Sequence, residues 1–237
     1  MVAKIDKLRT EECGGIVQIP VNGIKLEGSL TIPSQTRGIV LFAHGSGSSR
    51  HSPRNKFVAQ SLQSAGIGTL LLDLLTRQED ELYETRFDID LLTWRLERVT
   101  QWLMEQPESR SLAIGYFGAS TGAAAALNAA ATFGTAIGAV VSLGGRPDLA
   151  MSALPQVQSP TLLVVGGLDD VVIDLNRQAY EQLNTEKHLA VVPGATHLFE
   201  EPGALQEVAR LAAQWFKRHL GEKRRVEEVT RETGGGT

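Results

Sequence analysis

Three residues that could together activate a nucleophile occur in a set order along this chain. Ser120 lies in Gly-Ala-Ser-Thr-Gly, a G-x-S-x-G pattern where an apolar segment ends and an Ala-rich helical segment begins. Asp169 and then His197 follow it. A serine hydroxyl attacks a carbonyl only when a base takes its proton and an acid orients that base. The pattern and the order Ser, Asp, His therefore predict acyl transfer through Ser120.

The acid that orients the base must be held rigidly, as the end of a strand would hold it. Asp169 meets this requirement because it follows an apolar run and the turn Gly166-Gly167-Leu168. The competing acids are Asp170, which we expect at the surface or at a helix cap, Asp148 and Glu200. We therefore assign the acid to Asp169.

The base is assigned to His197, which follows the turn-rich stretch Pro193-Gly194-Ala195-Thr196 directly after the last apolar run. The other histidines lack such a context, and none has the paired spacing of metal ligands. The sequence therefore predicts a catalytic imidazole at His197 and no metal site.

The glycine-rich loop from His44 to Arg50 follows an early apolar run and has two interpretations. In the favoured one, Ser46 or Gly47 donates a backbone N–H to an oxyanion, Thr121 donates another, and His44 fixes the loop. In the other, the loop cradles a dinucleotide and Asp73 binds its ribose, although Arg50 then occupies the place of the third glycine.

Three arginines in expected loops or helix starts could bind a substrate carboxylate: Arg50, Arg54 and Arg146. The alternative for each is a surface ion pair, for example between Arg146 and Asp148. Residues 76–88 are too polar for a lid that docks on lipid, which disfavours long-chain fats. The sequence does not choose among short esters, lactones and thioesters.

Composition excludes several classes of protein. The net charge of −4 over 237 residues argues against a nucleic-acid surface. Cys13 is the only cysteine, so no disulfide can form within the chain and no thiolate zinc cluster can assemble. The charged first ten residues do not resemble a secretory signal, and we expect a cytoplasmic protein. The uncharged stretch between Arg110 and Arg146 is interrupted by polar residues and glycines, and is read as soluble core.

The order of elements predicts an α/β fold with one domain over residues 1–220 and a charged, Gly-rich flexible tail over 221–237. Residues 15–20 and 24–32 should form an antiparallel hairpin at Asn22-Gly23. The remaining strands are expected at 38–43, 68–72, 112–117, 137–142, 161–165 and 188–192, and the helices at 55–65, 89–105, 121–132, 175–183 and 203–220. Such alternation predicts a mostly parallel eight-stranded sheet with helices on both faces and the active groups beyond the carboxyl ends of its strands.

Taken together, these motifs resemble the α/β-hydrolase superfamily and, within it, its dienelactone-hydrolase-like branch. The resemblance extends from about residue 15 to residue 220. It implies the α/β-hydrolase fold, a nucleophile at Ser120, an acid at Asp169, a base at His197 and oxyanion donors at Ser46 and Thr121. Dienelactone hydrolases have cysteine at the nucleophile position, so the serine found here fits general carboxylesterase chemistry better.

The sequence thus predicts a serine hydrolase that cleaves small soluble esters, lactones or thioesters through an acyl-enzyme, without a cofactor. A small-molecule ester is the expected partner, with no nucleic acid and no membrane, and the chain is expected to be a monomer or homodimer. Three alternatives remain open: a non-catalytic ligand-binding module on the same fold, an acyltransferase, and a nucleotide-dependent oxidoreductase that uses the loop at Gly45.

Overall fold

The computed structural model describes residues 13–221, which contain eight strands and six α-helices joined by loops and short 3-10 turns. The strands are β1 (Cys13–Val21), β2 (Ile24–Ile32), β3 (Gly38–Ala43), β4 (Gly68–Leu72), β5 (Ala113–Ala119), β6 (Ile137–Leu143), β7 (Thr161–Gly166) and β8 (Lys187–Val192). The helices are α1 (Pro53–Ser64), α2 (Arg77–Asp80), α3 (Ile89–Glu105), α4 (Thr121–Phe133), α5 (Asp170–Gln182) and α6 (Ala204–Leu220). The tail predicted for 221–237 lies outside the described residues except for Gly221.

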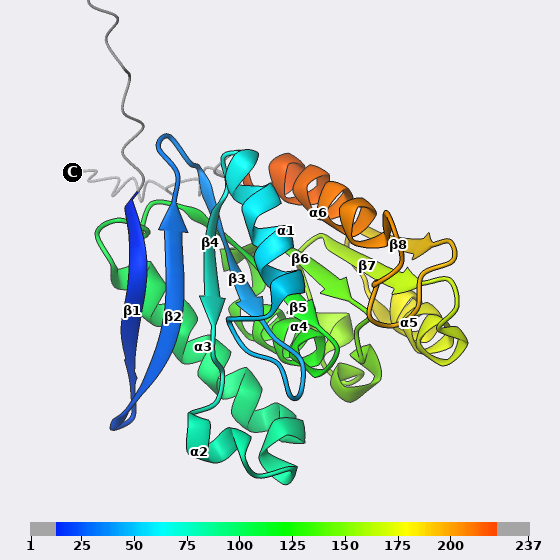
Figure 1. Cartoon of the computed structure of the whole chain (residues 1–237), viewed down its shortest axis with the longest axis horizontal. Helices are drawn as coiled ribbons and strands as arrows, with labels where there is room; N and C mark the ends of the chain where they lie inside the picture. The colour runs from blue at the N-terminus through cyan, green and yellow to red at the C-terminus, as the bar shows by residue number, and fades with distance from the viewer. Residues whose placement is uncertain (1–12, 222–237) are drawn as a thin grey trace, which may run out of the picture.

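All eight strands form one sheet in the order β1-β2-β4-β3-β5-β6-β7-β8 (Figure 1). β1 pairs antiparallel with β2, and β2 pairs antiparallel with β4. From β4 to β8 every pair is parallel. The predicted α/β-hydrolase fold is therefore confirmed, and the loops that follow β3 to β8 start from one edge of the sheet.

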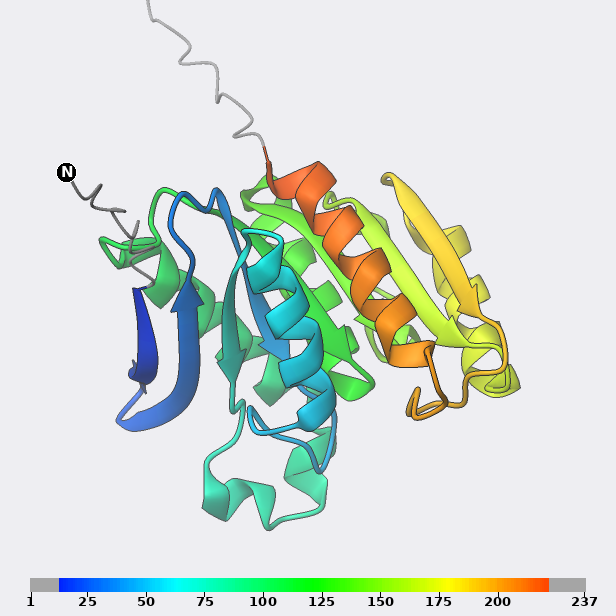
Figure 2. The ribbon, with the colours of Figure 1, turned by 45° about the horizontal axis from the view of Figure 1, so that its top comes forward.

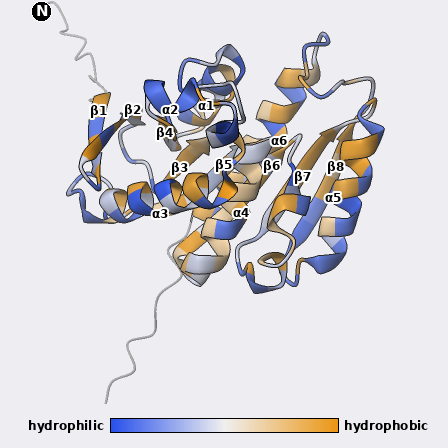
Figure 3. Ribbon diagram, turned by 90° about the horizontal axis from the view of Figure 1, so that it is seen from below, coloured by the Kyte–Doolittle hydropathy of each residue, from blue (hydrophilic) through white to orange (hydrophobic). Residues whose placement is uncertain are grey.

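Helices cover both faces of the sheet and create a core on each. α1 and α6 lie side by side on one face, while α3, α4 and α5 lie on the other (Figure 2). Alternate residues of β3 face the two cores: Leu41 packs with the α3 and α4 side chains, and Phe42 packs with those of α1 and α6. The outer helices α3 and α5 accordingly alternate polar and apolar residues (Figure 3).

Local sequence signals explain where the first elements begin and end. Asn22 and Gly23 have φ of 42° and 84°, the left-handed pair that a two-residue hairpin turn needs. Ser52 caps α1 by accepting a hydrogen bond from the N–H of Asn55, and Pro53 occupies the first helical position. The strands β3 and β4 have the predicted limits.

Two regions differ from the sequence prediction. α5 begins at Asp170, directly after Asp169, and not at residue 175. β-branched side chains fill its first turn, and such residues have a low helix propensity, so the sequence did not indicate a helix there. Residues 76–88, for which the sequence predicted no helix or strand, contain α2 and a 3-10 turn at Glu84–Phe87. A capping box between Thr76 and Glu79 starts α2. Both residues lie within one helical turn of each other in the sequence.

No helix within residues 13–221 is both long and apolar enough to cross a bilayer. The uncharged stretch between Arg110 and Arg146 is divided among β5, α4 and β6. Most of its residues in β5, α4 and β6 are buried in the sheet and in the helix packed on it.

Candidate active site

The predicted catalytic residues lie in loops beyond the carboxyl ends of four parallel strands. The His44–Arg50 loop follows β3, Ser120 follows β5, Asp169 follows β7 and His197 follows β8. Parallel strands direct these loops to one edge of the sheet. Residues far apart in the sequence therefore meet there.

Ser120 occupies a tight turn between β5 and α4. Its φ and ψ are 51° and −119°, which an L-residue rarely adopts, and its N–H donates to the carbonyl oxygen of Leu143 at 3.1 Å. The neighbouring glycines permit this turn: a Cβ on Gly118 would lie 2.5 Å from the Cα of Ala123, and a Cβ on Gly122 would lie 2.2 Å from the carbonyl oxygen of Ala43. Such contacts cannot be relieved by a side-chain rotation because they are with backbone.

Asp169 and His197 are joined by a hydrogen bond of 2.6 Å between Oδ2 of the carboxylate and Nδ1 of the imidazole. The aspartate side chain is 17% exposed and that of the histidine 39%. Their loops pack backbone to backbone, since a Cβ on Gly166 would lie 2.5 Å from the carbonyl oxygens of Ala195 and Thr196. A hydrogen bond at Nδ1 leaves Nε2 of His197 as the nitrogen able to serve a nucleophile.

Ser120 and His197 line the same pocket, whose volume is about 270 Å³. Its lining also includes residues from the loop after β3, the first turn of α1 and the segment after His197: Gly45, Ser46, Ser48, Ser52, Arg54, Asn55, Ala119, Leu143, Leu198 and Phe199. Within residues 13–221 the Ser120 hydroxyl makes no hydrogen bond. The pocket suits a small molecule, with apolar walls and polar donors among its lining residues.

The loop after β3 packs directly against the Ser120 turn. A Cβ on Gly45 would lie 3.0 Å from both the carbonyl oxygen of Ala119 and the Cβ of Ser120. The N–H of Ser46, one of the two predicted oxyanion donors, donates to Oγ1 of Thr121 at 3.0 Å. The N–H of Thr121, the other predicted donor, is at the first position of α4, where no intrahelical acceptor exists.

His44 is buried and fixes this loop, as the sequence predicted. Its Nε2 accepts a hydrogen bond from the N–H of Leu74 at 3.1 Å, and its Nδ1 lies 2.9 Å from the carbonyl oxygen of Gly45. Burial lowers the pKa of His44 below its ordinary value. The imidazole is therefore a neutral bridge between the loop and the end of β4.

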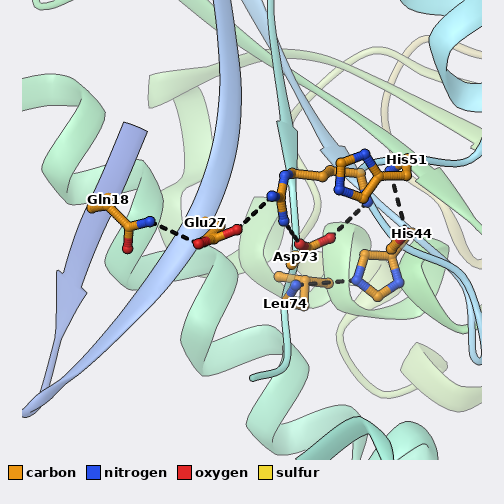
Figure 4. A network of polar contacts seen from close by, with 8 residues as sticks. Gln18, Glu27, His44, His51, Asp73 and Leu74 are labelled. Atoms are coloured by element: carbon orange, nitrogen blue, oxygen red, sulfur yellow. Dashed lines mark hydrogen bonds and ion pairs between the residues drawn. The ribbon is translucent and has the colours of Figure 1, made fainter. Parts of the chain in front are cut away.

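Arg50 lies on the far side of the loop, beside a separate hollow of about 620 Å³. Its guanidinium forms ion pairs with Asp73 and Glu27, and its N–H donates to Oδ1 of Asp73 at 2.6 Å. Figure 4 shows Glu27 on β2 and Asp73 directly after the neighbouring strand β4, with Gln18 bound to Glu27. The hydrogen bond from Gln18 and the charge of Arg50 hold the pKa of Glu27 below its ordinary value. Asp73, the ribose ligand in the dinucleotide interpretation, is thus held by Arg50.

The other two arginines proposed for substrate binding occupy different positions. Arg54 lines the Ser120 pocket, and its Nη1 donates to the carbonyl oxygen of Leu198 at 3.1 Å. Arg146 binds Asp148 through two hydrogen bonds of 2.8 Å, which raise the pKa of the arginine, and it is not among the residues that line the pocket. Of the three arginines, the structure brings Arg54 to Ser120.

Sequence reasoning missed two features near the site. Asn55, in the first turn of α1, is one of the residues that line the Ser120 pocket although it is only 6% exposed. The buried Arg95 of α3 binds Glu79 of α2 through two hydrogen bonds of 2.6 and 2.8 Å. The sequence Pro-Arg-Asn after a capping serine could have indicated the first feature, because it places an amide in a helical first turn.

Within the described chain, no group of three or more His, Cys, Asp or Glu residues could hold a metal ion.

The fold and this arrangement of loops are those of an α/β hydrolase. Residues 26–221 match the dienelactone hydrolase family, and the chain belongs to that family. Membership of this family supports a hydrolase.

Among solved structures, a dienelactone hydrolase from Anabaena variabilis is 56% identical to the chain, with a TM-score of 0.86, and the match covers 88% of this chain and 99% of that one. Est1E from Butyrivibrio proteoclasticus is 16% identical, with a TM-score of 0.76 over 88% of this chain and 100% of that one, and shows the same fold.

A protein of Mycobacterium tuberculosis, provisionally named a phosphoribosyl transferase, is 56% identical over 213 residues. That match covers 90% of this chain and 47% of the relative. The chain thus spans about half the length of the curated relatives it matches.

Proposed function

We propose that this protein is a serine hydrolase that cleaves small esters, lactones or thioesters through an acyl-enzyme on Ser120. The observation that carries the proposal is the hydrogen bond of Asp169 to His197 in a loop that lines the same pocket as Ser120. This hydrogen bond orients the imidazole and stabilises its protonated form.

The mechanism follows from these positions. His197 Nε2 accepts the proton of the Ser120 hydroxyl as its oxygen attacks the substrate carbonyl carbon. The negative charge that develops on the carbonyl oxygen is stabilised by backbone N–H groups, for which we propose Thr121 and Ser46. The imidazolium then gives its proton to the leaving oxygen or sulfur, and a water activated by His197 releases the acid from Ser120. The contact between Ser120 and His197 closes in the substrate complex, where such hydrogen bonds tighten.

Arg54 is the arginine we propose for binding the substrate, because it lines the pocket. The volume of the pocket favours a short acyl group. The phosphoribosyl transferase name belongs to a Mycobacterium relative about twice as long as this chain. The positions of Ser120, Asp169 and His197 support the proposal of acyl chemistry for this chain instead. We therefore keep phosphoribosyl transfer out of the proposal for this chain.

The deciding experiment compares the wild-type protein with Ser120→Ala, using p-nitrophenyl acetate as substrate and a fluorophosphonate as covalent label. We expect Ser120→Ala to lose label and to lose at least about 10³-fold in kcat, because no other group replaces the nucleophile. Ser64→Ala is the control, since Ser64 is exposed on α1 and its hydroxyl donates within that helix. Labelling of Ser120 without turnover of any ester, lactone or thioester would instead support a non-catalytic binding module, and normal turnover by Ser120→Ala would refute the proposal.

A further inference from the structure

The side chain of Asn55 is buried but has no hydrogen-bond partner. The residue is 6% exposed, and across residues 13–221 neither the oxygen nor the nitrogen of its amide bonds to another protein group. The amide atoms of Asn55 are not among the fully buried polar atoms of the described chain that lack a partner, so they remain accessible although most of the residue is covered. Since Asn55 lines the Ser120 pocket, its amide is available to whatever occupies that pocket.

Another buried asparagine in the chain behaves differently. The amide nitrogen of Asn176, in α5, donates to the carbonyl oxygens of Gly145 and Val172 at 3.1 and 2.8 Å. That amide holds a loop to a helix, which is a structural role. Asn55 has no such role, because its backbone N–H and not its side chain takes part in the cap of α1.

The loop after β3 has two predicted oxyanion donors, Ser46 and Gly47, and Gly47 is not among the residues that line the Ser120 pocket. The N–H of Ser46 is occupied by Thr121 Oγ1 at 3.0 Å, which leaves the N–H of Thr121 as the free member of the predicted pair. A developing oxyanion is stabilised best by two or more donors that are in place before the reaction. A second donor must therefore come from elsewhere in the pocket, or Ser46 must exchange its partner.

The first turn of α1 carries positive charge, which would stabilise a negatively charged substrate oxygen. It contains no acidic residue, and the N-terminus of a helix carries a partial positive charge. Arg54 adds a full positive charge beside Asn55, while its Nη1 is already committed to the carbonyl oxygen of Leu198. An amide that donates from this turn would face a potential that favours negative charge on the substrate oxygen.

We propose that the side-chain amide of Asn55 donates a hydrogen bond to the substrate carbonyl oxygen and joins the N–H of Thr121 in the oxyanion site, where Ser46 can take part only after its N–H releases Thr121 Oγ1. The inference rests on the proposed acyl transfer at Ser120 and makes Asn55 a catalytic residue of that reaction. An amide nitrogen can serve here because it needs no proton transfer, and its position is fixed by the rigid first turn of α1.

The test measures kcat and KM for p-nitrophenyl acetate with Asn55→Ala and Asn55→Asp. We expect kcat to fall by about 10²–10³ in Asn55→Ala with KM changed less than about twofold, because the interaction strengthens in the transition state. Asn55→Asp has the same shape but replaces the donor with a carboxylate, and it should be at least as slow. Gln60→Ala, which removes an exposed amide from the same helix, is the matched control and should keep the wild-type kcat.

A trifluoromethyl ketone that adds to Ser120 gives a second readout. Its affinity should fall by about the same factor as kcat, while thermal melting of both variants should stay within a few degrees of the wild type. Unchanged kcat and inhibitor affinity in both variants would overturn the inference, as would a rise in KM alone. If Ser120→Ala is inactive while the Asn55 variants keep full activity, only this inference fails; if Ser120→Ala is active, the proposed function fails as well.

Discussion

The backbone N–H of Ser46 and the side-chain oxygen of Thr121, 75 positions apart in the sequence, are joined by a hydrogen bond of 3.0 Å. Thr121 also provides the first N–H of α4. Thr121 therefore holds the loop after β3 in place, and its N–H is the group for which we propose the oxyanion role. This explains how two segments that are separate in the sequence keep a common geometry at Ser120.

The backbone at Ser120 should store strain that glycine would relieve. Its φ of 51° and ψ of −119° are readily adopted by glycine but not by residues with a Cβ. We expect Ser120→Gly to unfold with a free energy about 1 kcal/mol higher than that of Ser120→Ala, measured by urea denaturation. Both variants lack the hydroxyl, so their difference isolates the backbone. Equal stability of the two would show that the turn is relaxed.

Replacement of Asp169 by asparagine should remove the partner that orients His197. We expect kcat for p-nitrophenyl acetate to fall by about 10³–10⁴, because an amide cannot stabilise the imidazolium that forms during the reaction. The neighbouring Asp170→Asn is the control, since Asp170 is the first residue of α5 and, within residues 13–221, forms no hydrogen bond or ion pair with His197. Similar losses in the two variants would argue against Asp169 as the acid.

His44 should make the stability of the protein depend on pH. Burial lowers its pKa below the ordinary value of 6.5, so the unfolded chain takes up a proton at a pH where the folded protein does not. The free energy of unfolding should therefore fall as the pH drops below about 6.5, and this part of the slope should vanish in His44→Asn. His51→Asn, an exposed histidine on the same loop, is the control and should keep the slope. A slope that persists unchanged in His44→Asn would contradict the assignment.

The ion pair between Glu79 and Arg95 should hold α2 in place. Hydrogen bonds from Arg95, followed by those from Thr76, lower the pKa of Glu79 to about 2. A lowered carboxyl pKa stabilises the folded protein above pH 4.5, and the contribution is lost as the pH falls toward about 2. We expect Glu79→Gln to cost about 2 kcal/mol at pH 7, because the buried Arg95 loses its charged partner.

The control for Glu79 is Glu81→Gln, which removes an exposed carboxylate from the same segment. Urea denaturation at pH 7 and again near pH 3 should show the difference between the Glu79 variant and the wild type shrinking with acidity. If Glu79→Gln and Glu81→Gln lowered the free energy of unfolding equally at pH 7, the ion pair between Glu79 and Arg95 would contribute no more to stability than an exposed surface charge.

Much of the fold could be predicted because its signals are local. The hairpin follows from Asn22-Gly23, whose left-handed backbone is confirmed, and the apolar runs at 38–43 and 68–72 mark buried parallel strands with their correct limits. The pattern around Ser120 and the order of the acid and the base after it placed all three residues beyond strand ends.

What could not be predicted depends on contacts between distant segments. Arg50 stood out as a free cation in the sequence, but Asp73 and Glu27 neutralise it once β2 and β4 lie side by side. Asn55 attracted no attention because an asparagine in a helical first turn is ordinary. Its significance lies in the absence of a partner, which only the packing around the pocket reveals.

Gly144, which directly follows β6, has a φ of 49°, and a Cβ there would lie 3.3 Å from Cε1 of His197. On that side the imidazole of His197 lies close to the backbone of Gly144, and residue 144 has no side chain that could move to make room. Even a methyl group at this position would press on the ring directly. The position of the His197 ring is therefore limited by the backbone that follows β6, a strand from which no acid, base or nucleophile is proposed. A substitution at residue 144 could thus change the reactivity of His197 without altering any of the reacting groups.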